Sequence, residues 1–562
     1  MARKYVPEDF NVDDVEAVKA FYQGILDEEV PNDPAALREW LLKRMEIDCV
    51  MGEAAERRYV ATTLDTQDKE AEKAFQHLSN DVFPAVASID NAIDRKLNSH
   101  PAKEALRCEL DEMFKSVEVG LSLFSEANIP LGVELSNELQ DYQKITGAMT
   151  VDFDGQEQTV TQLRKYLKDP NRSVRESAWR AISDRYLQDK DALDDSFERM
   201  FKLRIQMAKN SGCKDFIEYI YKCKERPYGP KDCYAFHDSI RELIVPLIAK
   251  MYGKRREQLG VDTLRPWDLT VDPFNRKALA PFKDSADLVE HVDRVFEAMH
   301  PKAGEWARKM QAMKLVDADS RKSKAPGGYQ VQFPETRLPF IFMNAEGTDS
   351  DMYVLLHESG HSFHSFNYAD REFSVQRGAP LEFAEVASMS MELIGTEFLS
   401  QVYGDDEESI RRSKLDKFRD VLRLFPWVAK VDRFQHEIYS RPDHTREERK
   451  QIWHEIDEKF STGVVDYSGL EETEGYAWHE QLHIFEVPFY YIEYAIARIG
   501  SLQVWANYKK YGKKAIDDLF YAESLGCSRP LPELFEAAGI KFDFSPETLR
   551  PLIKMVTDEL GL

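Results

Sequence analysis

The motif His-Glu-x-x-His, which can hold zinc when it lies on a helix, occurs twice in this sequence. The upstream copy is HESGH, with His357, Glu358 and His361, and the downstream copy is HEQLH, which runs from His479 to His483. Two histidines four residues apart on a helix can direct imidazole nitrogens to one metal ion, while the glutamate reaches a water on that ion. Spacing alone does not show which copy binds metal, so the sequence around each copy has to be compared.

The sequence around HESGH predicts a helix. Thr348 and Asp351 form a Thr-x-x-Asp start signal, and an apolar segment that includes Leu355 and Leu356 follows them. Gly360, inside the motif, is a poor helix former by about 1 kcal/mol relative to alanine. We therefore expect its missing side chain to let another element approach closely.

A catalytic zinc site needs a third protein ligand and leaves the fourth position to water. His364 shares the helix face, but it lies about 10.5 Å along the axis beyond His357, too far to reach the same ion, so we interpret it as a packing or supporting histidine. Glu385 is the better ligand, because the small and apolar residues of GAPLEFAEVASMSMELI predict a buried helix that crosses the first. The alternative for HESGH is a surface helix with pairable charges.

The downstream copy has weaker support as a metal site. Pro488 follows His483 by five residues and restricts the helix that would have to carry the motif. No equally good acidic helix follows at short range. We interpret HEQLH as a motif look-alike, either on a surface helix or with a catalytic role that does not involve metal.

Composition limits the classes of function. The 562 residues carry a net charge of −25 without a long basic run, which argues against nucleic acid or an anionic membrane as the main partner. The first residues lack the apolar run of a signal peptide, and no stretch of about eighteen apolar residues predicts a membrane span, so we expect a soluble cytoplasmic protein. The six scattered cysteines form no Cys-x-x-Cys pair, which argues against a disulfide framework and a cysteine zinc site.

Helical periodicity fills most of the chain and predicts a mainly α fold. Two segments predict small β-hairpins: residues 149–163, around the turn Asp154-Gly155, and residues 327–344, just before HESGH. A Pro-Asn loop near residue 170 is followed by a new helix. We place a boundary there, with an N-terminal helical region at 1–170 and a catalytic region at 171–562.

Several segments, in this order, resemble the thimet oligopeptidase and oligoendopeptidase F family of zinc peptidases, and within it the bacterial oligoendopeptidase F and Pz-peptidase type. They are DPNRSVRESAWRAI, LRPWDL, GGYQVQFPETRLPFIFMNAEGTDSDMYVLLHESGHSFH, LEFAEVASMSMEL, FPWVAKVDRFQHEIY and HIFEVPFYYIEYAIA. The resemblance implies a helical, two-lobed peptidase with a deep central channel for short peptides and a small β-hairpin or sheet beside the active site.

The resemblance also implies roles for individual residues. It makes His357, His361 and Glu385 the ligands of one zinc ion and Glu358 the general base. It places a histidine, His483, and the tyrosines after it on the substrate carbonyl. The spacing of those tyrosines departs slightly from the thimet branch, so their correspondence stays open: Tyr490 is assigned to substrate binding, and Tyr491 and Tyr494 to catalysis.

The predicted hairpin before the zinc helix has a further use. An edge strand in GGYQVQ could pair with the backbone of an extended peptide, with Gly327 and Gly328 leaving room beside Tyr329. The alternative is a turn that only needs permissive backbone angles.

The expected reaction is hydrolysis of internal bonds in short peptides. A metallocarboxypeptidase or dipeptidyl carboxypeptidase of related fold, and a peptide-binding protein without catalysis, are the rival interpretations. Oligomeric state stays open.

Overall fold

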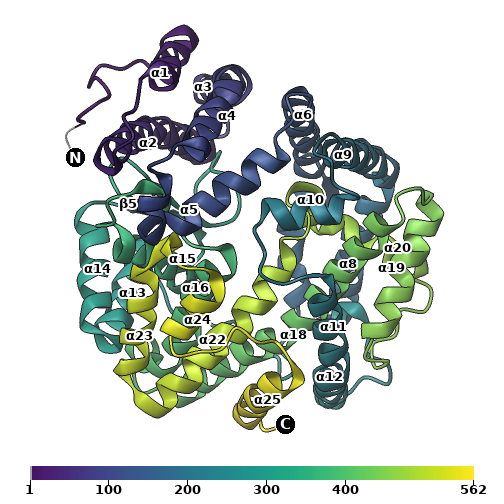
Figure 1. Ribbon diagram of the computed structural model, residues 1–562. Helices are drawn as coiled ribbons and strands as arrows, with labels where there is room; N and C mark the ends of the chain where they lie inside the picture. The colour runs from purple at the N-terminus through teal and green to yellow at the C-terminus, as the bar shows by residue number, and fades with distance from the viewer. Residues whose placement is uncertain (1–2) are drawn as a thin grey trace. The chain divides into compact units, whose positions relative to one another are not determined.

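The computed structural model describes residues 3–562, most of which are helical, as the sequence predicts (Figure 1). The chain divides into two compact units, each assembled from three stretches. Unit 1 contains the described residues up to Glu126, Leu279–Lys414 and Ile496–Asp543, and unit 2 contains Ala127–Ala278, Leu415–Ala495 and Phe544–Leu562. This agrees with the two lobes that the resemblance implies, while the boundary between residues 170 and 171 stays a prediction.

Unit 1 holds a three-stranded sheet and the upstream motif. Its helices are α1 (Val15–Asp27), α2 (Pro34–Leu64), α3 (Lys69–His77), α4 (Phe83–Ser99), α5 (Lys103–Leu123), α13 (Ser285–Met299), α14 (Pro301–Ala312), α15 (Asp349–Tyr368), α16 (Leu381–Gly395), α17 (Ser400–Tyr403), α23 (Lys513–Ser524) and α24 (Leu531–Ala537). Its strands are β3 (Val316–Asp319), β4 (Tyr329–Phe333) and β5 (Leu338–Ala345).

Unit 2 is helical apart from one hairpin. Its helices are α6 (Asn128–Gly147), α7 (Val160–Leu163), α8 (Arg172–Gln188), α9 (Lys190–Asn210), α10 (Phe216–Cys223), α11 (Pro230–Leu243), α12 (Val245–Leu259), α19 (Arg446–Phe460), α20 (Glu471–Gly475), α21 (Leu482–Glu486) and α25 (Pro546–Leu560), and its strands are β1 (Thr150–Phe153) and β2 (Gln156–Thr159). Two helices, α18 (Glu407–Ser440) and α22 (Tyr491–Tyr511), contribute residues to both units.

The first helices of unit 1 follow from their amphipathic pattern. The Asp33 side chain accepts a hydrogen bond from the Ala36 N–H at 2.9 Å, and Pro34 occupies the first turn, so α2 has a well-defined start. Leu37, Trp40 and other apolar residues of α2 pack with α1, α4 and α5 in one buried cluster. Burial of this face holds the N-terminal helices together.

Both predicted hairpins are present. In the first, Asp154 and Gly155 both have positive φ angles, 54° and 75°, as a two-residue turn between antiparallel strands requires. In the second, β4 pairs antiparallel with β5, from Tyr329 opposite Phe342 to Phe333 opposite Leu338. The strand order is β3-β5-β4, so β4 is an edge strand of this three-stranded sheet.

Helix α15, which carries HESGH, lies at the centre of unit 1. It contacts β5, α13, α14, α16 and α23, and it packs against α16 along much of its length (Figure 1). Its start is fixed as predicted, because the Asp351 carboxylate accepts hydrogen bonds from the backbone N–H groups of Thr348 and Glu346, each at 2.8 Å.

Gly360 stands where α15 and α16 cross. A Cβ atom added to it would lie 2.5 Å from the Cα of Ser388 and 2.9 Å from the carbonyl oxygen of Ala387, both on α16. The expected close approach of another element at Gly360 is therefore confirmed. Within residues 3–562 no helix combines the length and the apolar character that crossing a membrane requires.

Candidate metal centre

Three metal-ligating side chains converge where α15 and α16 cross. His357 and His361 lie on successive turns of α15, and Glu385 lies on α16 with 6% of its surface exposed. The Glu385 Oε2 atom is 3.3 Å from Nε2 of His357 and 3.7 Å from Nε2 of His361. One donor atom from each residue lies within 4.8 Å of the other two.

These separations fit a zinc site. Zinc binds histidine nitrogen at about 2.0 to 2.1 Å, so two ligands of a tetrahedral ion stand about 3.3 Å apart. The observed 3.3 and 3.7 Å lie close to that value. The donor set of two imidazoles and one carboxylate is one of those found in catalytic zinc sites that keep a position for water.

Two further residues hold this group in place, and sequence reasoning did not find them. Glu392, two turns after Glu385 on α16, accepts a hydrogen bond from Nδ1 of His357 at 2.5 Å. Arg498 of α22 donates to the other oxygen of Glu392 at 3.4 Å. The seven-residue spacing between the two glutamates was the available signal for Glu392, whereas nothing in the sequence connects Arg498 with this helix.

The orientation of His357 follows from these contacts. Because Nδ1 faces a carboxylate, it carries a proton and leaves Nε2 directed at the side where His361 and Glu385 meet. Ser388 helps to hold Glu385, since its hydroxyl donates to Oε2 at 3.1 Å. Helix α16 thus supplies the candidate ligand Glu385 and also Glu392, which orients the candidate ligand His357.

The electrostatics of the group favour a cation. Burial opposes a proton on His357, but hydrogen bonds to Glu385 and Glu392 outweigh it and raise the pKa of this imidazole. Burial would raise the pKa of Glu385, yet His361 and His357 hold that pKa well below its usual range. The buried Glu385 carboxylate therefore stays ionised beside the two histidines, and a divalent ion can take the place of the proton that His357 otherwise holds.

Glu358 follows His357 on α15 and is 7% exposed. Burial raises the pKa of its carboxyl to about 7. A group with a pKa near neutrality is suited to accept and return a proton at physiological pH. His364 packs against Tyr368 and Phe383, and burial lowers its pKa to about 3, so it behaves as the packing histidine that the sequence predicts.

The downstream motif does not form one α-helix. A 3₁₀ helix, Ala477–Glu480, ends before Gln481, whose extended backbone separates it from α21. His479 is buried and its Nε2 lies 3.3 Å from Oδ1 of Asp194, which also accepts from Arg449 at 2.9 Å. His479 and His483 therefore lack the helical i, i+4 geometry, and His479 belongs to a buried ion-pair group of unit 2.

His483 instead lies among aromatic residues. Its ring is within 6 Å of the rings of Tyr490, Tyr491 and Tyr494, and its Nε2 is 3.5 Å from the Tyr494 hydroxyl. Burial raises the pKa of Tyr491 to about 12, so this phenol stays protonated near neutral pH. The structure brings the predicted histidine and all three predicted tyrosines together.

The proton of His483 has a defined position. The Trp427 indole N–H, which can only donate, bonds to Oε1 of Gln481 at 2.7 Å. The Gln481 amide nitrogen then faces Nδ1 of His483 at 2.6 Å and donates to it. A neutral His483 therefore carries its proton on Nε2, where it can be donated. Sequence reasoning missed Gln481, although it lies inside HEQLH.

Three of the predicted substrate-binding residues, Gly327, Gly328 and Tyr329, lie on or beside the edge strand β4, whereas Tyr490 lies beside His483. Gly327 and Gly328 are exposed, and Gly327 has a φ of 98°, which satisfies the turn interpretation. A Cβ on Gly328 would lie 3.3 Å from Val354 of α15. The Tyr329 ring stacks on Phe342 with centroids 4.7 Å apart, and its hydroxyl hydrogen-bonds Thr63.

Several known proteins are similar to this chain in sequence or in fold. The oligoendopeptidase F (plasmid) of Lactococcus lactis subsp. cremoris is 24% identical over 403 residues, which are 70% of this chain and 62% of that relative, less than two thirds of its length. The oligopeptidase PepF of Bacillus subtilis is 23% identical over 481 residues, 83% of this chain and 68% of that protein. A structure of Pz peptidase A with an inhibitor superimposes with a TM-score of 0.91 at 27% identity and 99% coverage of both chains.

Two family descriptions match separate parts of the sequence. Residues 7–124 match the peptidase M3 N-terminal domain, and residues 165–552 match peptidase family M3. The second match alone takes in more than half of the 562 residues and contains both the α15–α16 crossing and the His483 group. The chain belongs to peptidase family M3.

Proposed function

We propose that this protein is a zinc-dependent oligoendopeptidase that hydrolyses internal bonds of short peptides. The observation that carries the proposal is the convergence of His357, His361 and Glu385 at separations suited to one zinc ion, with Glu358 on the same helix. Membership of peptidase family M3 supports the reaction class and peptide substrates. A cytoplasmic location stays a prediction.

His357, His361 and Glu385 would hold the zinc. Zinc held there would supply a water molecule with a pKa near neutrality and a Lewis acid for the carbonyl of the bond to be cut. Glu392 keeps His357 in the tautomer that presents Nε2, and Ser388 keeps the Glu385 carboxylate in place.

Glu358 takes a proton from the attacking water and delivers it to the nitrogen of the leaving amine. Its raised pKa, about 7, suits both transfers near neutral pH. As water attacks, the carbonyl oxygen gains negative charge, and a donor placed there stabilises the transition state more than the substrate. His483 supplies an Nε2–H donor, and the hydroxyl of Tyr494 or Tyr491 supplies a second.

The edge strand β4 supports a mode of substrate binding. An unpaired strand edge can accept an extended peptide through backbone hydrogen bonds, which gives affinity without a strict demand for one side chain. The exposed Gly327 and Gly328 precede the strand, with Tyr329 at its first position. Their role in binding is part of the proposal.

Hydrolysis of an internally quenched fluorescent peptide tests the proposal. We expect activity that a chelator abolishes and zinc restores. Glu358→Gln should retain zinc and lose nearly all turnover, because the carboxamide cannot accept the water's proton. Wild-type turnover in Glu358→Gln would refute the assigned base, and activity unaffected by complete metal removal would refute a zinc peptidase.

Product analysis separates the rival enzymes. Peptides blocked at the C-terminus are poor substrates for carboxypeptidases, so internal cleavage of blocked peptides supports an endopeptidase. Release of single residues or dipeptides only from free C-termini would instead indicate a metallocarboxypeptidase or dipeptidyl carboxypeptidase. Absence of any hydrolysis by the zinc-loaded protein would indicate a peptide-binding protein.

A further inference from the structure

Two helices of unit 2 each present a pair of metal-ligating residues at helical spacing. Cys233 and His237 are four residues apart on α11, and Asp432 and His436 are four residues apart on α18. Residues four apart share a helix face, so each helix directs both of its side chains the same way. All four are buried, and Cys233, Asp432 and His436 have no exposed surface.

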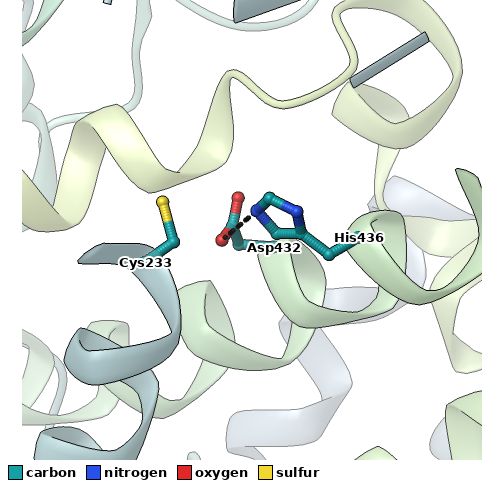
Figure 2. Close-up of side chains that lie close together, drawn as sticks. All are labelled: Cys233, Asp432 and His436. Carbon is teal, nitrogen blue, oxygen red and sulfur yellow. Dashed lines mark ion pairs between the residues drawn. The ribbon is translucent and has the colours of Figure 1, made fainter. Parts of the chain in front are cut away.

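The donor atoms of these helices meet. Figure 2 shows the Asp432 carboxylate between the Cys233 thiol and the His436 imidazole. One donor atom each from Cys233, Asp432 and His436 lies within 4.8 Å of the other two, and His436 Nε2 is 3.4 Å from Oδ2 of Asp432. The Tyr221 hydroxyl of α10 lies 3.2 Å from the Cys233 sulfur and 3.2 Å from His436 Nε2.

The Tyr221 hydroxyl lies 3.2 Å from both the Cys233 sulfur and His436 Nε2, close to the distance of about 3.3 Å between ligands of a tetrahedral zinc ion. His237 completes the arrangement from outside, because its Nε2 holds Oδ2 of Asp432 at 2.9 Å. A second residue that orients a ligand in this way is usual around protein-bound metals.

Hydrogen bonds among these groups do not satisfy all of them. Within residues 3–562, Oδ1 of Asp432 is buried and lacks a hydrogen-bond partner. Leaving a buried polar group without a partner costs about 1 to 3 kcal/mol, and more for a charged group. Arg226, which stacks on Tyr221, is itself paired with Glu493 at 2.6 Å. An unpaired carboxylate oxygen beside a thiol and an imidazole is a position that a metal ion would satisfy.

We propose that Cys233, Asp432 and His436, with the Tyr221 hydroxyl as fourth donor, form a second metal site that binds Zn²⁺ and links α10, α11 and α18. One sulfur, one nitrogen and two oxygens make four ligands, the number that fills the tetrahedral coordination of a structural zinc ion. Metal entry displaces the thiol and phenol protons to solvent. The site is independent of peptide hydrolysis, since it uses none of the residues assigned to that reaction.

The sulfur ligand distinguishes this site from the α15–α16 centre. The first centre offers only nitrogen and oxygen, whereas the second includes a cysteine sulfur, which would bind a metal as the thiolate. Cobalt(II) replaces zinc in both kinds of site, and only a cobalt–thiolate bond gives an intense charge-transfer absorption in the near ultraviolet. Cobalt loading of the full-length protein therefore reports the second site separately.

We expect the wild-type protein to bind two Co²⁺ ions per chain by elemental analysis and to show the thiolate band. Cys233→Ser should abolish the band and reduce the content to one ion. Cys213→Ser is the matched control, because Cys213 is also a buried cysteine of unit 2 but lies outside the cluster. The thiolate band of the Cys213→Ser variant should equal that of the wild type.

The double variant His357→Ala with Glu385→Ala removes the first centre and leaves the cluster intact. This double variant should retain one Co²⁺ and the full thiolate band. Because it keeps Cys233, it tests the second site even if the Cys233→Ser variant does not fold. A wild-type protein that binds one Co²⁺ without the band would refute the site and leave a hydrogen-bonded core network. A band that survives Cys233→Ser would equally refute it.

Discussion

Replacing Gly360 by alanine tests the helix crossing that assembles the candidate metal centre. The new Cβ would lie 2.5 Å from the Cα of Ser388 and 2.9 Å from the carbonyl oxygen of Ala387. Carbon atoms pack at about 3.5 to 4.0 Å, so α15 and α16 must separate by about 1 Å at this point. Both contacts are with backbone atoms, which cannot relieve the overlap by a change of rotamer as a side chain can.

Two opposing effects set the change in stability. Alanine favours a helix by about 1 kcal/mol over glycine, whereas overpacking costs about 1 to 3 kcal/mol. Because the contact falls on backbone, we expect a cost near the upper end and a net destabilisation of about 1 to 2 kcal/mol. Thermal and denaturant unfolding of the metal-free protein measure this value.

The same shift should weaken zinc binding. Glu385 lies one turn before Ser388, so a movement of about 1 Å changes the separations of 3.3 and 3.7 Å between its carboxylate and the two histidines. Metal–ligand distances tolerate only about 0.2 Å. We expect zinc affinity, measured by competition with a chelator, to fall about 10- to 100-fold, as for residues that support ligands.

Gly253→Ala is the matched control. Gly253 lies in the middle of α12, and a Cβ there would meet no atom within 4 Å. This variant should be as stable as the wild type or more stable by up to about 1 kcal/mol, with unchanged zinc affinity. If Gly360→Ala behaved like Gly253→Ala in both measurements, the close crossing would not be what positions Glu385.

Three further substitutions separate the roles of neighbouring groups. Glu392→Gln removes the negative charge that faces Nδ1 of His357 and should lower zinc affinity about 10- to 100-fold by chelator competition; wild-type affinity would contradict the supporting role of Glu392. His483→Ala should keep zinc and lower kcat about 100- to 1000-fold in the peptide assay, and loss of zinc would restore HEQLH as a metal site. Asp194→Asn removes the nearer and more deeply buried of the two carboxylates that Arg449 pairs with, leaving Glu198 at 3.6 Å, and should destabilise the protein by about 3 kcal/mol in denaturant unfolding, with zinc content unchanged. Unaltered stability would show that His479 and Asp194 do not form a structural group.

Local chemistry explains which parts of the site could be predicted. The start of α15 depends on Thr348 and Asp351, three residues apart, and the approach of α16 depends on Gly360 having no side chain. Both are properties of short stretches of sequence. Arg498 reaches Glu392 from α22, more than 100 residues away along the chain. Such a contact depends on the tertiary fold, and one sequence carries no local signal for it.

The two HExxH copies also show that a short motif does not determine the local structure that carries it. HESGH forms a metal-binding geometry because its helix is capped, continuous and crossed closely by α16. HEQLH has the same letters, but Gln481 breaks the helix between its two halves. Pro488 hinted at the weak helix, yet only the structure shows that Gln481 itself connects Trp427 to His483 and fixes the proton on Nε2. In the downstream copy, the residue that a motif search treats as variable therefore sets the chemistry of the histidine that follows.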